Sequence, residues 1–271
     1  MSRALVLGGG GPVGIGWEAG VLTGLHDAGI GLREADFVVG TSAGSVVGAQ
    51  LTTGRELADV VAPMGQAPAW ATENPGAGAP DLAALIASGR GTGITEAAFI
   101  ARFAFLQTPE WPVNFRCTAF GIDSGRFAVW DREAGVAIER AVASSCSVPG
   151  LSPAVSIAGE QYIDGGARDM LNADLAIGHD RVIALSCVVL DAPEGAVPDL
   201  LAGRLPDVRA HLDELRATGS AVEVVEPSDE VRELSGWGAY LMDHARTAAA
   251  FDAGVRQGKA EAARLQPVWS A

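Results

Sequence analysis

The pentapeptide Gly-Thr-Ser-Ala-Gly at positions 40–44 constrains the fold of this chain more than any other feature. Residues 35–39 before it are mostly apolar and predict a short strand, whereas residues 45–51 after it are mostly small and predict the start of a helix. A strand, a tight turn and a helix form a nucleophile elbow, in which the residues flanking the strained turn must be small. The sequence therefore predicts an α/β fold that holds Ser42 at a helix N-terminus, where backbone N–H groups favour negative charge.

Four consecutive glycines follow the apolar residues 4–7, and residues 15–28 predict a helix after them. Glycine is entropically costly to order, so such a run indicates a backbone cradle for an anion. The cradle fits either the oxyanion of acyl transfer or a dinucleotide pyrophosphate, because Gly-x-Gly-x-x-Gly is satisfied by Gly9, Gly11 and Gly14. A dinucleotide site also needs an acidic residue at the end of the second strand. That position holds Gly40 and the serine turn, so the oxyanion interpretation ranks first.

A candidate general base, Asp164, ends a short apolar segment and is followed by two glycines. No histidine stands on a comparable loop, and we interpret all four as surface or cap residues: His26, His179, His211 and His244. A serine without a suitable histidine predicts a dyad in which the carboxylate accepts the Ser42 proton. The other acids considered, Asp123 and Asp131, are expected to form Asx turns.

Ser42, the glycine loop and the Asp-Gly-Gly motif together resemble the patatin-like phospholipase family. Residues 143–153, Ala-Ser-Ser-Cys-Ser-Val-Pro-Gly-Leu-Ser-Pro, are similar to the family's Ala-Ser-x-Ala-x-Pro-x-x-Phe-x-Pro segment. Asn172 resembles the asparagine of the family's Asn-x-Pro, although Ala-Asp follows it here. The motifs occur in the family's order, and the resemblance covers roughly residues 3–190.

The resemblance implies a three-layer α/β/α fold with a mostly parallel central sheet. It implies a single domain over residues 1–271, whose C-terminal strand and long helix pack on the same sheet. The implied activity is hydrolysis of lipid acyl esters, of the phospholipase A, lysophospholipase or esterase type. Alternatives are a dinucleotide-binding protein that uses the glycine loop and a catalytically silent acyl-binding regulator. The intact Ser42 and Asp164 argue against the silent regulator.

Carried over residue by residue, the resemblance makes Ser42 the nucleophile and Asp164 the base. The oxyanion donors implied are the backbone N–H groups of Gly10 and Gly11, with Ala43 contributing. The residues expected to shape the site are Gly9, Gly14, Gly40, Gly44, Pro149, Gly165 and Gly166. One departure is Val13, where the family usually has Arg or Lys. It bears on phospholipid head-group preference more than on hydrolysis.

The charge balance limits the partners of this chain. A formal net charge of −14 opposes binding to nucleic acid and to anionic membrane surfaces, so we expect at most transient membrane contact. The three cysteines, at 117, 146 and 187, lack metal-ligand spacing, and neither a metal nor a cofactor is expected. The apolar part of the N-terminus is too short for a signal peptide, and no apolar run reaches ~18 residues. We therefore expect a cytoplasmic protein that acts on a lipid or other acyl ester.

The remaining pattern alternates between strands and helices. Strands are expected at 3–7, 36–40, 113–120, 126–130, 154–158, 160–163, 181–189 and 221–225. Helices are expected at 15–29, 43–53, 95–106, 134–144, 207–218 and 238–265, and prolines and glycines predict a loop at 63–80.

Overall fold

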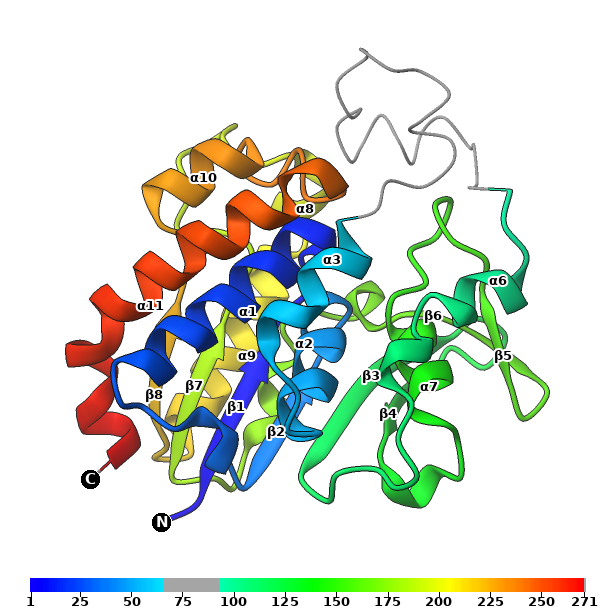
Figure 1. Ribbon diagram of the computed structural model, residues 1–271, viewed down its shortest axis with the longest axis horizontal. Helices are drawn as coiled ribbons and strands as arrows, with labels where there is room; N and C mark the ends of the chain where they lie inside the picture. The colour runs from blue at the N-terminus through cyan, green and yellow to red at the C-terminus, as the bar shows by residue number, and fades with distance from the viewer. Residues whose placement is uncertain (66–92, 271) are drawn as a thin grey trace.

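The computed structural model describes residues 1–65 and 93–270. The described strands form one eight-stranded sheet of order β5-β6-β3-β2-β1-β7-β8, with β4 also paired to β3 (Figure 1). Their bounds are β1 (Arg3–Leu7), β2 (Phe37–Gly40), β3 (Phe115–Gly121), β4 (Phe127–Trp130), β5 (Val155–Ile157), β6 (Glu160–Asp164), β7 (Arg181–Leu185) and β8 (Ala221–Val225). The pairs along β3-β2-β1-β7-β8 are parallel, whereas β4, β5 and β6 pair antiparallel.

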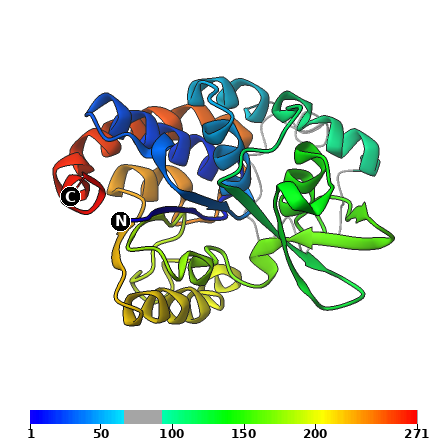
Figure 2. The same cartoon turned by 90° about the horizontal axis from the view of Figure 1, so that it is seen from below.

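Helices lie on both faces of this sheet. They are α1 (Gly11–Asp27), α2 (Ala43–Thr52), α3 (Val61–Met64), α6 (Glu96–Ala101), α7 (Ile138–Ser145), α8 (Asp199–Ala202), α9 (Leu205–Ala217), α10 (Asp229–Ser235) and α11 (Thr247–Ser270). Figure 2 shows α1, α2 and α11 on one face and α9 on the other, which confirms the expected three-layer fold with a mostly parallel sheet. None of the described helices is both long and apolar enough to cross a membrane.

The central strands are apolar because both of their faces are covered. All five residues of β7 are buried, as are four of the five in β1. Parallel strands enclosed by helices have no solvent face and so carry continuous apolar runs. These two strands lie side by side in the parallel part of the sheet, and β1 leads into the glycine loop at the carboxyl edge of that part.

The first and last helices pack closely together through glycines. A Cβ at Gly20 would lie 2.1 Å from the carbonyl oxygen of Phe251, and one at Gly254 would lie 2.4 Å from that of Trp17. The indole Nε1 of Trp17 donates a hydrogen bond of 2.8 Å to Gln257. Helix α11 also contacts β7 and β8. The C-terminal strand and helix therefore extend the sheet and the layer that the N-terminal elements begin.

Two strands that carry candidate site residues end on the same edge of β3. Strand β4 pairs with residues 117–120 of β3, on the edge opposite to both β2 and β6. On the shared edge, the last residue of β2, Gly40, pairs with Cys117, and the last residue of β6, Asp164, pairs with Ala119. Strands β2 and β6 run in opposite directions along β3, so their carboxyl ends meet there.

The structure corrects several predicted boundaries. The helix expected at 15–29 begins at Gly11, because the following Pro12 has no N–H to leave unpaired in a first turn. The helix expected at 238–265 begins at Thr247, directly after a 3-10 turn at His244–Arg246 whose first residues are capped by the Asp243 side chain. Helix α10 was not predicted, and the strand expected at 181–189 is shorter, as the bounds of β7 show. Residues 66–80 of the expected loop lie outside the described residues.

Candidate active site

The turn that carries Ser42 is strained and closely packed. Ser42 has φ 51° and ψ −113°, a conformation that non-glycine residues rarely adopt. A Cβ at Gly40 would lie 2.2 Å from the Gly44 carbonyl oxygen, and one at Gly44 would lie 2.2 Å from the Leu7 carbonyl oxygen. Both flanking positions therefore exclude any side chain, as a nucleophile elbow requires.

Neighbouring side chains occupy the backbone groups of Ser42. Its N–H donates to the Ser145 hydroxyl at 3.0 Å. Its carbonyl oxygen accepts from the Ser45 hydroxyl at 2.6 Å and from the Cys146 thiol at 3.3 Å. These bonds fix the backbone of the elbow and leave the Ser42 hydroxyl as the group that can react.

Asp164 lies beside this hydroxyl at the end of β6. Its carboxyl is 6% exposed, and burial raises its pKa from 3.8 to about 6. Hydrogen bonds from the Ser42 side chain and from the Gly166 N–H, the latter 2.7 Å long, oppose the rise. A Cβ at Gly165 would lie 2.1 Å from the Thr118 hydroxyl, so this glycine lets the loop approach β3. The carboxyl therefore titrates near neutral pH, where a general base is effective.

The glycine loop presents unpaired N–H groups next to Ser42. The N–H of Gly9 donates to Met170 at 2.7 Å, and that of Gly8 donates to Leu185 at 3.1 Å. The three predicted oxyanion donors make no backbone hydrogen bond to any described residue: Gly10, Gly11 and Ala43. A Cβ at Gly9 would lie 3.4 Å from the Ser42 Cβ, which shows how closely the loop approaches the serine. Free N–H groups at this position suit a developing negative charge.

A buried carboxyl group, that of Glu18, accepts a hydrogen bond from the backbone of the glycine loop. Glu18 is 0% exposed, and one of its oxygens accepts a 2.8 Å hydrogen bond from the Gly8 N–H. Burial raises the pKa of Glu18 well above its usual range, while the bonds from Gly8 and Cys187 lower it. The Cys187 sulfur fills the space under the loop, since a Cβ at Gly10 would lie 2.5 Å from it. The glycines thus allow the loop to close over this pair.

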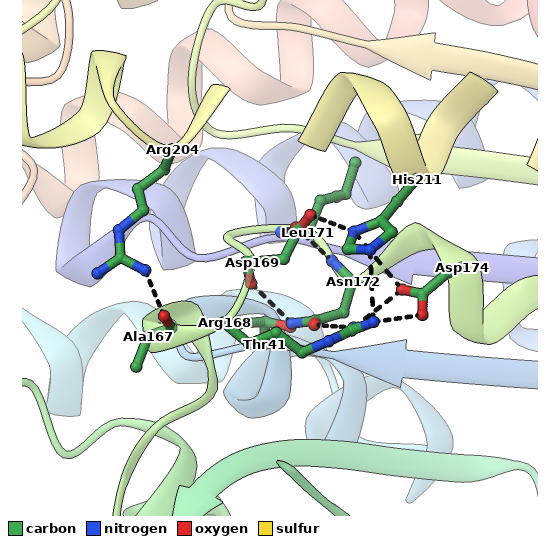
Figure 3. A network of polar contacts seen from close by, with 9 residues as sticks. All are labelled: Thr41, Ala167, Arg168, Asp169, Leu171, Asn172, Asp174, Arg204 and His211. Carbon is green, nitrogen blue, oxygen red and sulfur yellow. Dashed lines mark hydrogen bonds and ion pairs between the residues drawn. The ribbon is translucent and has the colours of Figure 1, made fainter. Parts of the chain in front are cut away.

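A network of polar side chains ties the loop after Asp164 to the elbow and to α9, as Figure 3 shows. The buried Asp169 accepts from the backbone N–H of Asn172 at 2.7 Å and contacts Nδ1 of His211 at 2.6 Å. The Asn172 amide donates to the Thr41 hydroxyl at 2.9 Å. Thr41 directly precedes Ser42, so this network connects the segment after the base to the segment before the nucleophile. Arg168 closes it with an ion pair of 2.6 Å to Asp174.

Ser42 opens into a small, mostly apolar cavity of about 80 Å³. Its lining includes Met64, Phe99, Phe103 and Val148, together with the polar side chains of Arg102, Ser152 and His244. A larger groove of about 1040 Å³ runs along α10 and α11 and is not lined by Ser42, whereas Asp164 lines neither space. The small cavity is therefore the candidate active site despite its size.

Two histidines are not the surface residues that the sequence predicted. His211 contacts Asp169 in the polar network, and its side chain is 22% exposed. His244 lines the Ser42 cavity, and its Nδ1 lies 2.6 Å from the Met64 carbonyl oxygen. Both histidines lie in polar or amphipathic sequence segments, and such a pattern does not indicate a contact with a residue far away in the sequence. His26 is exposed, and His179 bonds to the Ala176 carbonyl near a turn.

The remaining residues singled out from the sequence are Gly14, Pro149 and Val13, and each has different surroundings. Gly14 packs against Cys187 under the loop, and Pro149 is exposed in the turn beside the cavity. Val13 is 1% exposed and packs in the core. Three further residues of this region, Glu18, Arg102 and Asp169, were not predicted from the sequence. Of these, only Glu18 carried a usable signal, as an acid in the middle of an apolar, glycine-rich helix. In residues 1–65 and 93–270, no three His, Cys, Asp or Glu side chains gather as a metal site would require.

Comparisons with known proteins agree with the motifs. The model of a family described as patatin-like phospholipase matches residues 5–177. Among solved structures, VipD from Legionella pneumophila matches with a TM-score of 0.44 and 13% sequence identity, over 93% of this chain and 67% of that one. No curated protein gives a significant match.

Proposed function

The chain belongs to the patatin-like phospholipase family, whose activity is lipid acyl hydrolysis, and we propose that Ser42 and Asp164 perform this reaction as a dyad. The observation that carries the proposal is the meeting of β2 and β6 on one edge of β3. Gly40 and Asp164 pair with positions 117 and 119 of that strand, so the nucleophile turn and the carboxylate are neighbours. Two segments far apart in the sequence thereby form one site.

The proposed reaction begins when the Asp164 carboxylate accepts the Ser42 hydroxyl proton. The serine oxygen then bonds to the carbonyl carbon of the ester, and the carbonyl oxygen takes the negative charge. In this proposal the N–H groups of Gly10, Gly11 and Ala43, which make no backbone hydrogen bond to a described residue, donate to that oxygen. As the ester bond breaks, the carboxylic acid returns its proton to the departing alkoxide, and an acyl-serine remains.

Water completes the cycle by the reverse sequence. Asp164 takes a proton from water, the hydroxide bonds to the acyl carbon, and the serine oxygen leaves with the proton that Asp164 returns. Each half reaction needs the carboxylate in its ionised form, which its pKa of about 6 provides at neutral pH. The partly apolar cavity suits the acyl chain of a lipid ester.

The test is hydrolysis of a short-chain 4-nitrophenyl ester by wild type and by Ser42→Ala. We expect kcat to fall at least about 10³-fold, because the covalent step is lost while the N–H groups remain. Ser152→Ala is the matched control, since Ser152 lines the same cavity and is not placed beside Asp164. Wild-type turnover in Ser42→Ala, or an equal loss in Ser152→Ala, would contradict the proposal.

The dinucleotide alternative makes a separate prediction. Strand β2 ends at Gly40 in the elbow, so it supplies no carboxylate for a ribose. We therefore expect no thermal stabilisation by NAD or NADP. As a separate expectation, EDTA should not reduce ester hydrolysis, because the proposed reaction uses no metal ion. A clear shift of the melting temperature with either dinucleotide would favour the alternative.

A further inference from the structure

Arg102 places a positive charge in the wall of the candidate active site. It directly follows α6, and it lines the cavity of about 80 Å³ that also contains Ser42. Burial lowers the pKa of its guanidinium, yet arginine remains protonated in proteins because its pKa starts so high. The apolar side chains of Phe99, Phe103 and Met242 line the same cavity. The charge therefore lies where water is partly excluded.

The guanidinium of Arg102 has no hydrogen-bond or ion-pair partner within residues 1–65 and 93–270. Among the arginines of residues 1–65 and 93–270, it alone makes no hydrogen bond or ion pair to a described residue. Acids are abundant in this chain, which has 33 Asp and Glu against 19 Lys and Arg. A half-buried positive charge that no described residue pairs with is energetically unfavourable. An anionic ligand bound in the cavity beside Ser42 would supply the missing partner.

The second basic side chain of the cavity, His244, does not supply a comparable charge. Burial and the nearby Arg102 lower the pKa of His244, whereas the Met64 carbonyl and Asp243 raise it, and the net direction is downward. Its Nδ1 is engaged by the Met64 carbonyl oxygen at 2.6 Å. Arg102 is thus the permanent cation among the described residues that line the cavity.

We propose that Arg102 binds an anionic oxygen group of the substrate, a phosphate or a carboxylate close to the scissile ester, and makes the enzyme prefer anionic acyl esters. The planar guanidinium can donate two parallel hydrogen bonds to such a group. This proposal rests on the proposed function, and it adds the chemical class of the substrate. Arg102 is then a substrate-binding residue, and the reacting atoms remain those of Ser42 and Asp164.

The experiment compares kcat/KM for two matched pairs of esters. Lysophosphatidic acid and a monoacylglycerol of the same chain differ by a phosphate on the leaving group. The 4-nitrophenyl monoester of succinate and 4-nitrophenyl butyrate differ by a carboxylate on the acyl side. In Arg102→Gln, the ratio of anionic to neutral kcat/KM should fall about tenfold or more in at least one pair, mainly through KM. The pair that responds identifies where the anion lies.

Two further variants separate recognition from structure. Arg102→Lys keeps the positive charge but lacks the two parallel donors of the guanidinium. Its ratio of anionic to neutral kcat/KM should therefore lie between those of wild type and Arg102→Gln. Arg132→Gln is the control, because Arg132 is an exposed arginine outside the cavity that pairs with Glu133. An unchanged ratio in both pairs, or equal losses on charged and neutral esters in Arg102→Gln, would overturn the proposal.

Binding of inorganic phosphate tests the subsite without catalysis. Phosphate should raise the melting temperature of wild type and of Arg132→Gln, and the shift should be lost in Arg102→Gln. Equal shifts in all three proteins would contradict the anion subsite. If wild type hydrolyses none of the four esters, the proposed function fails, and the phosphate measurement still decides whether Arg102 binds an anion.

Discussion

The elbow that carries Ser42 and the loop that follows Asp164 lie side by side, but different forces hold them. Steric contact fixes the elbow, since neither Gly40 nor Gly44 has room for a Cβ. Charged and polar side chains fix the loop, where Asp169 bonds to two backbone N–H groups and to His211 on α9. Both regions also have distant partners, but those of the elbow are close backbone contacts and hydrogen bonds to its main chain, whereas those of the loop are side chains that contact a buried carboxylate. The two regions should therefore respond differently to substitution and to pH.

The largest effect is expected from filling the elbow. A Cβ at position 44 would lie 2.2 Å from the Leu7 carbonyl oxygen, which is backbone and cannot turn away. Gly44→Ala should lower the free energy of unfolding by about 3 kcal/mol or more, measured by urea denaturation. Gly203→Ala is the control, because its Cβ would meet only an ordinary contact at 3.4 Å. Equal stability of the two variants would show that the elbow is not sterically fixed.

A smaller effect on stability and a selective effect on activity are expected from the loop network. Asp169→Asn removes the charge that His211 and two backbone N–H groups contact, while it preserves the size of the side chain. We expect a loss of about 10- to 100-fold in kcat/KM, because the segment beside Asp164 loses its anchor. His211→Gln keeps a polar partner for Asp169, so its loss should stay below about tenfold.

The results for Asp169→Asn and His211→Gln can also contradict the contrast between the elbow and the loop. If Asp169→Asn retains full activity, the loop is held by its backbone, as the elbow is. If His211→Gln loses several orders of magnitude, the histidine takes part in the chemistry and the dyad is wrong. Near-ultraviolet circular dichroism of both variants separates a lost fold from a displaced base.

The sequence predicted the elbow better than the loop for a physical reason. Positions 40–44 and the glycine run can be recognised from residue size within each motif, because a close backbone contact there requires glycine. The contact between His211 and Asp169 joins residues on different elements, and nothing near either one indicates it. Arg102 was missed for the same reason, since a single arginine at the end of a short helix resembles any surface residue.

The same contrast explains the boundary errors. The strands β1 and β8 were predicted at their observed bounds because apolar periodicity within them is local. The start of α11 follows the 3-10 turn at His244–Arg246, which Asp243 caps within a stretch whose pattern favours a helix throughout. The long-range packing of α1 on α11, through glycines such as Gly20, was not visible in the residues around either helix alone.

A moderate effect is expected from pH, and it should arise from Asp164. Its pKa is about 6 because burial disfavours the charged form. Catalysis needs that charged form, so kcat/KM should fall about tenfold between pH 7 and pH 5 and stay level above pH 7. A pH–rate profile with constant ionic strength measures this. A profile that is flat down to pH 4.5 would exclude Asp164 as the base.

The raised pKa of Asp164 affects stability in the opposite direction from activity, because the neutral carboxyl group favours folding whereas the charged one is needed for catalysis. The folded-state pKa exceeds the unfolded value, so the neutral carboxyl favours folding below about pH 4, and this contribution is lost as pH rises through about 6. Asp164→Asn should therefore become more stable than wild type above pH 6, by on the order of 3 kcal/mol. Urea denaturation at pH 4 and pH 8 measures the difference. A gain that is equal at both pH values would contradict the assigned pKa.

The smallest effect is expected from Glu18, although its carboxyl group is fully buried under the glycine loop. Its raised pKa favours the neutral carboxyl, and glutamine has nearly the same shape and keeps an acceptor for the Gly8 N–H. Glu18→Gln should change the free energy of unfolding by less than about 1 kcal/mol. Glu18→Leu, which removes the acceptor, should cost more. Equal costs would show that the bond to Gly8 does not support the loop.

The most direct test of the account is the rate at which a fluorophosphonate probe labels the protein, with the modified residue mapped by mass spectrometry. The probe reacts with a serine only when a nearby base activates it. We predict labelling at Ser42 in wild type, none at that peptide in Ser42→Ala, and a rate at least about 10²-fold lower in Asp164→Asn. Labelling of another serine, or an unchanged rate in Asp164→Asn, would contradict the Ser42–Asp164 dyad.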